Sequence, residues 1–549
     1  MKTKRLLLTG ALALWPALLS AQLLDPALLA KPATDAWPTY NGDYSGRRFS
    51  TLTQINQKNV KHLSLSWILR VQVGATPGSI IGGEEPKPAE GALTDPGIST
   101  IKATPLMLNG VLYFSTPDNV WAVDARSGIV IWHYYWKTKG GIHIGNRGVG
   151  IYGNWLFFET PDNYLVSLDA RTGKERWHKV IADVKQEYFS TPAPIIVGNH
   201  VLVGIGGDSL DVPGFLRAYD PENGEIQWQW WSEPLKKSDA GGETWPDEYS
   251  MRHGGGMTWV PGTYDPDLHL YYLGTGNPNP VLTGKSRLGD NLYTCTIVAL
   301  NVDTGKLVWH FQPSPHDTHD WDAAQTPVLI DGEIEGKPRK LLAQANRNGY
   351  FFLLDRTNGK SIVTAPMIET MNWSKGLSAA GQPIPDPAKE ATIEGALVSP
   401  NTSGATNWPP PSFDPETGLF YVGTAATFSM FYLTDTDPHP EGWGAAERDA
   451  GFMGAYLNAI DYKTGKIVWK HKYLFGGGAV GMLTTAGKLL FTGDSGRNLI
   501  AFDPTNGDIL WHAGLADGLS NGPITYLLDG QQYVIAGAGD SLYAFSLQD

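Results

Sequence analysis

The sequence predicts an all-β protein, an eight-bladed β-propeller of four-stranded antiparallel blades that is closed by joining the N- and C-terminal strands. Three observations support this fold class: a repeated strand–turn–strand–tryptophan unit, partial units at the two ends that complement each other, and the composition. The chain of 549 residues contains 20 tryptophans and 64 glycines. Aromatic residues together with many glycines are typical of turn-rich β proteins.

The repeat is seen in "VWAVDARSGIVIW", which places a turn of Asp, Ser and Gly between two apolar strands and ends at Trp132. Asp bonds to the local backbone of such a turn, and Gly accepts its positive φ. Further copies end at Trp177, Trp228, Trp309, Trp469 and Trp511. About eight units at intervals of roughly 40 to 50 residues match the period of a propeller blade. We expect these tryptophans to dock one blade against the next.

The remaining units are incomplete. "GYFFLLDRTNGKSIV" keeps its turn at Asp355 and Gly359 but has no Trp, while "HLSLSWILRV" supplies Trp67 without a preceding turn. The last stretch, "YVIAGAGDSLYAFSLQD", supplies strands without a Trp. The two ends of the chain together make one blade, so the predicted propeller domain covers residues 35–549.

Two long insertions interrupt the repeat, one between Trp228 and Trp309 and the other between Gly359 and Trp469. Insertions in a repeat protein gather on one face, which is often the binding face. We therefore expect the functional residues there.

The N-terminus reads "MKTKRLLLTGALALWPALLSAQ", with a basic start, an apolar run and a small-residue cleavage site. This pattern predicts a secretory signal peptide over residues 1–21 and a periplasmic protein. The apolar run is shorter than the ~20 residues that span a bilayer, so no membrane span is expected. A net charge of −13 argues against a nucleic-acid partner. Cys295 is the single cysteine, which excludes an intrachain disulfide and a covalently attached c-type haem.

Two stretches, "WPTYNGDYSGRRFSTLTQINQKNVKHLSLSW" and "WVPGTYDPDLHLYYLGTGNPNP", resemble signature segments of the quinoprotein alcohol dehydrogenases, which are periplasmic eight-bladed propellers. The resemblance covers essentially the whole mature chain. It implies that the protein holds pyrroloquinoline quinone (PQQ) and one metal ion, calcium or a lanthanide, and oxidises an alcohol. Because the sequence contains no haem motif, the resemblance also implies a separate cytochrome c-type electron acceptor.

The resemblance assigns catalytic and metal-binding roles. In "PHDTHDWDAAQTP", Asp320 matches the general base, which takes a proton from the substrate hydroxyl while hydride moves to the quinone C5. Asp322 matches an additional Asp that coordinates the ion in lanthanide-using members. Asn277 matches a metal-binding amide, and Arg347 would polarise the ortho-quinone oxygens. Without the resemblance, the Asp and His cluster indicates either a generic metal site or a solvated acidic loop.

Cofactor contacts follow in the same way. Trp259 matches the indole on which the planar quinone stacks. Arg147 in "GNRG" would meet a quinone carboxylate, Thr191 in "FSTPAP" would donate a hydrogen bond, and Asn407 in "GATNWPP" matches a further contact. Taken alone, each arginine is more often an ordinary ion-paired side chain.

The sequence also departs from the family. Gly141-Ile142 occupies the place of a vicinal disulfide that covers the quinone, and the metal-binding Glu position falls on Ser209 in "GGDSLDVPG". In that stretch we expect Gly207 and Asp208 to contact the cofactor, and either Asp208 takes over metal ligation or the metal site is weakened.

Lys102 replaces a family Glu near the quinone carboxylates, which adds positive charge. The chain is therefore identified as a divergent member of the family. Two alternatives stay open at this point. One is a cofactor-free propeller that acts as a periplasmic scaffold or binding module. The other is a different enzyme on the same fold, such as a metal-dependent hydrolase or lyase.

Overall fold

The structure, a computed structural model, describes residues 24, 26–83, 99–207, 211–474 and 480–548. Within these ranges the protein is built from β-strands, and its single α-helix is α1 (Glu248–Arg252). No helix of the described chain is long and apolar enough to cross a membrane. The short 3-10 helices are η1 (Pro26–Ala30), η2 (Val60–His62), η3 (Val184–Gln186), η4 (Gly242–Thr244) and η5 (Pro387–Lys389).

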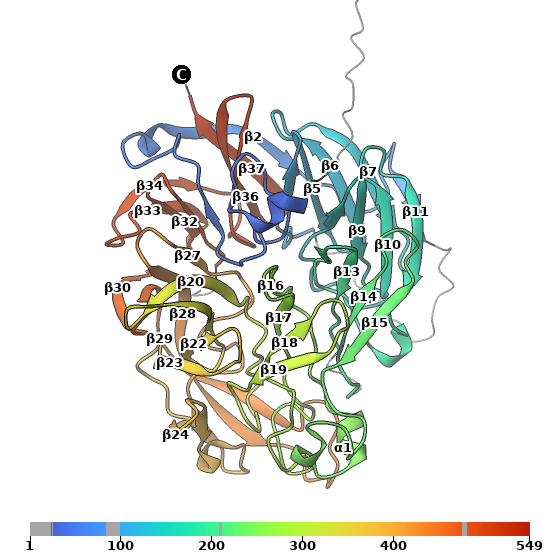
Figure 1. Ribbon diagram of the computed structural model, residues 1–549, viewed down its shortest axis with the longest axis vertical. Helices are drawn as coiled ribbons and strands as arrows, with labels where there is room; N and C mark the ends of the chain where they lie inside the picture. Colours follow the sequence, from blue (N-terminus) through green and yellow to red (C-terminus); the bar gives the residue numbers. More distant parts are fainter. Residues whose placement is uncertain (1–23, 25, 84–98, 208–210, 475–479, 549) are drawn as a thin grey trace, which may run out of the picture.

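Eight sheets of the described chain have four or five strands each, and they follow one another around the molecule in Figure 1. The first five are β4 (Leu106–Leu108), β5 (Val111–Thr116), β6 (Asn119–Asp124) and β7 (Val130–Trp136) with β3 (Ile80–Gly82); β8 (Gly150–Tyr152), β9 (Trp155–Glu159), β10 (Tyr164–Asp169) and β11 (Glu175–Val180); β12 (Ile195–Val197), β13 (His200–Val203), β14 (Phe215–Tyr219) and β15 (Ile226–Trp231); β16 (Thr263–Asp265), β17 (Leu270–Gly274), β18 (Ile297–Asn301) and β19 (Leu307–Phe311); and β20 (Val328–Ile334), β21 (Lys337–Ala345), β22 (Tyr350–Asp355) and β23 (Ser361–Pro366).

The other three sheets are β26 (Ala396–Val398), β27 (Ser412–Asp414), β28 (Leu419–Leu433), β29 (Ala445–Asp461) and β30 (Ile467–Lys472); β31 (Leu483–Thr485), β32 (Leu489–Gly493), β33 (Asn498–Phe502) and β34 (Ile509–Gly514) with β1 (Phe49–Ser50); and β35 (Ile524–Leu528), β36 (Gln531–Ala538) and β37 (Ser541–Leu547) with β2 (Leu63–Arg70). A two-stranded hairpin, β24 (Ser374–Leu377) and β25 (Pro383–Pro385), lies outside these sheets.

The two ends of the chain meet in one sheet. β2 pairs antiparallel with β37, from Leu63 opposite Leu547 to Arg70 opposite Ser541, and Figure 1 shows the blue and red strands side by side. This pairing confirms the predicted closure. Closing a ring of sheets hides strand edges that would otherwise be free to pair with other chains.

The repeated tryptophans join neighbouring sheets, as predicted. Each indole N–H donates to a backbone carbonyl of the following sheet. For example, Trp309 Nε1 donates to the Arg356 oxygen at 2.9 Å, and Trp228 Nε1 donates to the Val302 oxygen at 2.8 Å. Trp132, Trp177, Trp469 and Trp511 make the equivalent bond to the oxygens of Ala170, Glu222, Pro504 and Leu63.

The turn glycine of the following unit packs against the same indole. A Cβ at Gly359, where φ is +74°, would lie 2.5 Å from Trp309 Cε3. Glycine is therefore required both by the dihedral angle and by the close approach of the ring. One joint differs. Gly465 faces the side chains of Ala365 and Val363, because the unit ending in β23 has no tryptophan.

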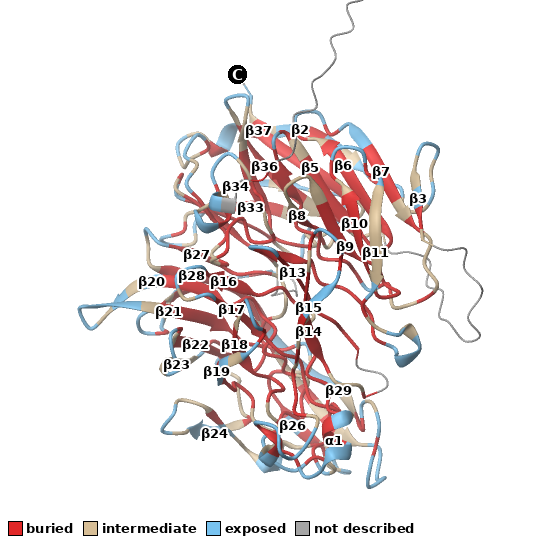
Figure 2. Ribbon diagram, turned by 45° about the vertical axis from the view of Figure 1, so that its right-hand side comes forward, coloured by how far each residue is buried: buried red, intermediate tan, exposed pale blue. Residues whose placement is uncertain are grey.

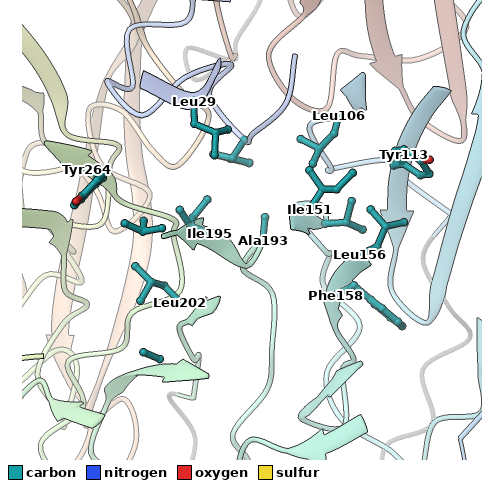
Figure 3. Packing of buried hydrophobic residues seen from close by; sticks show 14 of the residues in the cluster. Leu29, Leu106, Tyr113, Ile151, Leu156, Phe158, Ala193, Ile195, Leu202 and Tyr264 are labelled. Atoms are coloured by element: carbon teal, nitrogen blue, oxygen red, sulfur yellow. The ribbon is translucent and has the colours of Figure 1, made fainter. Parts of the chain in front are cut away.

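The core is continuous across several sheets. Buried residues run through the strands, and exposed residues gather in the connecting loops (Figure 2). Figure 3 shows Leu29 of η1 pointing toward the cluster that contains Ile151 and Ile195. The N-terminal segment thus packs onto the strands of two neighbouring blades.

We expect Gly359→Ala to lower the free energy of unfolding by about 3 kcal/mol, because the new methyl group combines an unfavourable φ with a clash against Trp309. Gly336→Ala is the matched control. Its φ is also +74°, but nothing lies within 4 Å of a Cβ built there, so we expect a loss of about 1 kcal/mol. Urea unfolding of both variants measures the difference, and equal losses would contradict the docking role of the glycine.

Candidate active site

The predicted site residues lie in connecting segments next to strand ends of different sheets. Arg147 lies between β7 and β8, Thr191 precedes β12, Trp259 precedes β16, Asn277 follows β17, and Arg347 lies in the turn between β21 and β22. The strands β8, β12, β16, β17 and β22 that adjoin these segments are mostly buried. A rigid scaffold therefore presents side chains from loops, which is the usual arrangement of binding and catalytic residues.

Asp320, Asp322 and Arg347 form one ion-paired group. Arg347 Nη2 lies 2.8 Å from Asp320 Oδ2, and Arg347 Nη1 lies 3.1 Å from Asp322 Oδ2. The Asp322 side chain is 4% exposed and that of Asp320 is 17% exposed. One guanidinium thus holds two carboxylates together, and only the Asp320 carboxylate is partly open to solvent.

Asp322 connects this group to two other predicted residues. Trp259 Nε1 donates to Asp322 Oδ2 at 2.6 Å, and the backbone N–H of Asn277 donates to Asp322 Oδ1 at 2.7 Å. Asp322 therefore fixes the edge of the Trp259 indole and the position of the Asn277 backbone at the same time.

On the other side of Trp259 lies Arg147. Its Nη1 donates to Thr191 Oγ1 at 2.6 Å, and its guanidinium carbon lies 4.7 Å from the ring centroids of both Trp259 and Trp408. Cation–π attraction and stacking favour this position between two indoles. A continuous series of contacts thus runs from Thr191 through Arg147, Trp259 and Asp322 to Arg347 and Asp320.

The buried charges perturb one another. Burial lowers the pKa of Arg347, but the adjacent carboxylates of Asp320 and Asp322 more than offset this, so its pKa is raised and the guanidinium stays charged. Burial raises the pKa of Asp322, and the Arg347 cation and the N–H of Trp259 oppose that rise. Burial lowers the pKa of Arg147 to about 10. Such strongly coupled buried groups are typical of functional sites.

Two predicted residues, Asn407 and Gly207, lie apart from this series. Asn407 binds within its own loop, donating from Nδ2 to the Ser403 oxygen at 2.9 Å. Gly207 lies against Tyr188 and Met257, the latter two residues before Trp259. Asp208, predicted as both a cofactor contact and a metal ligand, lies outside the described residues, as does Ser209.

Two residues of the site were missed in the sequence. Trp408 stacks on Arg147, and the Thr402 carbonyl accepts from Arg347 Nη2 at 2.5 Å. Trp408 directly follows Asn407, which the resemblance had already assigned to the site, so its place in the sequence could have identified it. A backbone carbonyl has no sequence signal at all.

Lys102 also belongs to the surroundings of the site. Burial and the charge of Arg147 lower the pKa of Lys102, and Lys102 Nζ donates to the carbonyl of Ile144, three residues before Arg147. Such a pair of cations favours an anionic ligand.

The polar groups present fit a tri-carboxylate quinone and a hard cation. Arg147 Nε and Arg347 Nε are buried and find no acceptor in the described chain, so each retains a donor for an anionic ligand. The oxygen atoms of Asp320, Asp322 and Asn277 are of the type that hard cations prefer. Within the described ranges no three His, Cys, Asp or Glu side chains converge on one point. A cation bound there would share the Asp320 and Asp322 carboxylates with Arg347.

The sequence matches the family described as "Glucose/ethanol/alcohol dehydrogenase, beta-propeller domain", labelled PQQ, over residues 37–393 and 455–534. The chain belongs to the PQQ-dependent alcohol dehydrogenase family. It is 35% identical to the quinoprotein alcohol dehydrogenase PedH of Pseudomonas putida over 558 residues, which cover 94% of this chain and 89% of that protein. The resemblance found in the sequence is thereby confirmed, and at this identity the chain is a divergent member.

Solved structures agree with this membership. The quinohemoprotein alcohol dehydrogenase of Comamonas testosteroni superposes with a TM-score of 0.84 at 31% identity, covering 96% of this chain and 83% of that one. A europium-containing methanol dehydrogenase gives a TM-score of 0.80 at 30% identity, covering 95% and 99% of the two chains. The PQQ family member described here is accordingly an alcohol dehydrogenase-like oxidoreductase.

We expect Arg347→Met to destabilise the protein by about 3 to 5 kcal/mol, because it leaves two buried carboxylates without their counter-charge. A metal cation can replace that charge, so calcium or lanthanum should raise the melting temperature of Arg347→Met more than that of the wild type.

Arg356→Met is the matched control for that measurement. Arg356 is also buried and contacts two carboxylates, those of Asp265 and Asp331, each at 2.7 Å, but it lies outside the series of contacts described above. Thermal melts with and without metal test the pair of variants. An equal response to metal would show that the Asp320–Asp322 pair has no special affinity for a cation.

Proposed function

We propose that this quinoprotein dehydrogenase is exported to the periplasm, holds PQQ with one calcium or lanthanide ion, and oxidises an alcohol with Asp320 as the base. The observation that carries the proposal is the unbroken series of contacts from Thr191 to Asp320. A propeller acting only as a scaffold has no need of two buried arginines and two buried carboxylates around an indole that takes no part in blade docking.

The cofactor would be held by its planarity and its charge. PQQ carries three carboxylates, and Arg147 and Lys102 supply cations on one side of the site while Arg347 supplies one on the other. Trp259 offers an indole face for stacking, and Trp408 lies across Arg147 from it. Thr191 Oγ1, which accepts from Arg147 at 2.6 Å, would keep that guanidinium in place beside a carboxylate.

When bound, PQQ supplies a two-electron acceptor, and the metal ion supplies a Lewis acid. The Asp320 carboxylate would accept the proton of the substrate hydroxyl at one of its Oδ atoms. Arg347, 2.8 Å from Asp320 Oδ2, favours the ionised form of that carboxylate and fixes its orientation. Because Asp320 is partly exposed, the proton can leave to solvent after the reaction.

The metal would be coordinated by the side-chain oxygens of Asn277, Asp320 and Asp322, with Asp208 as a further ligand. Two carboxylates next to one another suit an ion of high charge. The europium-containing methanol dehydrogenase among the similar structures supports a lanthanide as one of the two choices.

The location and the electron acceptor follow from the sequence. Residues 1–21 have the pattern of a secretory signal. The chain has no Cys-x-x-Cys-His motif, so we propose that a separate cytochrome c-type protein receives the electrons.

The proposal predicts that PQQ quenches tryptophan emission when added to the purified protein with calcium or lanthanum, because the quinone stacks on Trp259. Asp320→Asn should bind PQQ like the wild type but lower alcohol-dependent dye reduction by about a thousandfold, since the base is lost. Asp331→Asn, an exposed acid on β20, serves as the control and should keep its activity. Absence of quinone binding with either metal would overturn the proposal.

A second prediction concerns the ion. Asp322→Asn removes one negative charge from the proposed ligand set, so it should weaken the binding of lanthanum more than that of calcium. Metal titrations of the PQQ-loaded protein, followed by quinone absorbance, give the two affinities. An equal loss for both ions would remove Asp322 from the ligands that select the metal.

A further inference from the structure

The segment that carries Arg147 is fastened to the propeller by three separate side chains. We name residues 141–148 the anchored loop. Asn146 accepts from Ser115 Oγ at 2.5 Å and donates to the Glu159 carbonyl at 2.9 Å, while Lys102 Nζ donates to the Ile144 carbonyl at 2.5 Å. The third fastening is His143, whose imidazole lies inside the protein against the turn between β5 and β6.

His143 and Asp118 form a buried pair. His143 Nε2 lies 2.7 Å from Asp118 Oδ2, and the two side chains are 2% and 6% exposed. His143 Nδ1 lies 3.2 Å from the Gly141 carbonyl, within the same loop. The imidazole thus joins the start of the anchored loop to the neighbouring turn, four residues before Arg147.

The partners of the imidazole determine how many protons the pair holds. The Gly141 carbonyl can only accept, so Nδ1 carries a hydrogen. Nε2 then faces a carboxyl oxygen at hydrogen-bond distance, which requires a proton between Nε2 and Oδ2. The pair is therefore either an imidazolium with a carboxylate or a neutral imidazole with a carboxylic acid, and in both forms it has no net charge.

Loss of that proton would leave the neutral imidazole with one N–H for two acceptors, so a ring-nitrogen lone pair would face either the Asp118 carboxylate or the Gly141 carbonyl. Burial raises the pKa of Asp118 to about 6, against the lowering by the hydrogen bond and charge of His143, and nearby Asp162 raises it further. Both contacts of the imidazole are accordingly hydrogen bonds at low pH, and one of the two is lost as the pH rises through the pKa of the pair.

Other charged groups face the pair. Asp162 accepts from Trp136 Nε1 at 2.9 Å and from the Lys139 backbone at 2.8 Å. Burial raises the pKa of Tyr135, with Asp118 adding to the rise and Lys137 opposing it. These groups come from β7, the segment after β7 and the turn between β9 and β10, and the variants used below leave all of them unchanged.

We propose that the proton-sharing pair of His143 and Asp118 is a positioning device for Arg147, which fixes the anchored loop without a covalent link and thereby sets the affinity for the quinone. The inference rests on the proposed function for the identity of the ligand. It concerns the very loop in which Gly141-Ile142 stands where a covering disulfide was expected from the resemblance. Unlike a disulfide, the pair holds the loop with both of its hydrogen bonds only while it keeps its proton.

The test uses the full protein with added PQQ and calcium or lanthanum. We expect His143→Ala to weaken PQQ binding by about tenfold, which is the usual effect of removing a side chain that orients a ligand-binding group. The same variant should increase hydrogen exchange in residues 141–148 of the protein without PQQ. The matched control is His178→Ala, which breaks a pair of the same length, His178–Glu175 at 2.7 Å, on β11.

The proton requirement is tested with Asp118→Asn. An amide at this position donates to the neutral imidazole and needs no extra proton, and Asn tolerates the left-handed backbone of residue 118, where φ is +66°. We expect PQQ affinity of the wild type to fall as the pH rises and that of Asp118→Asn to change much less. Lys102 is the same in both proteins, so its titration cancels in the comparison.

Each outcome decides the inference. Equal PQQ affinity in His143→Ala and His178→Ala, or the same pH profile in the wild type and Asp118→Asn, would overturn it. If the wild type binds no PQQ, the proposed function fails. Hydrogen exchange then remains as the test of whether the His143–Asp118 pair fixes the anchored loop. Faster exchange of residues 141–148 in His143→Ala then still supports the anchor, whereas unchanged exchange refutes it.

Discussion

The docking of each tryptophan onto the next sheet is the interaction on which the rest of this structure depends. An isolated four-stranded sheet of this size cannot bury both faces, so every sheet needs two neighbours. The indole supplies apolar area and one directed hydrogen bond, and the turn glycine lets the backbone approach the ring. The last indole, Trp511, reaches Leu63 at the start of β2, so the same contact also closes the ring.

Ring closure explains why the site can be built from residues far apart in the sequence. Thr191, Trp259, Asp322 and Arg347 belong to connections of different sheets, yet they contact one another in series. Charges buried in this way are costly unless each has a partner. The arginines satisfy the carboxylates in the protein alone, and the same groups are available to an anionic cofactor and a cation.

The fold could be predicted from the sequence because its signals are local and repeated. The turn chemistry, the spacing and the terminal tryptophans of the complete units survive in the structure, and the pairing of β2 with β37 was implied by the incomplete ends. The site residues Arg147, Trp259, Asp322 and Arg347 could be located only through resemblance to a family. Trp408, the Thr402 carbonyl and the His143–Asp118 pair were not foreseen, because they depend on loop geometry that no periodic pattern encodes.

The joint without an indole has a mechanical consequence. Every tryptophan joint described above combines a hydrogen bond with ring packing, but Gly465 meets the side chains of Ala365, Val363 and Phe351 and no indole. The sheet beyond this joint also carries the long strands β28 and β29, of 15 and 17 residues. A closed ring yields first at its weakest seam. Opening at this seam breaks no indole hydrogen bond, so we expect the sheets to separate more readily between β23 and β30 than at a tryptophan joint.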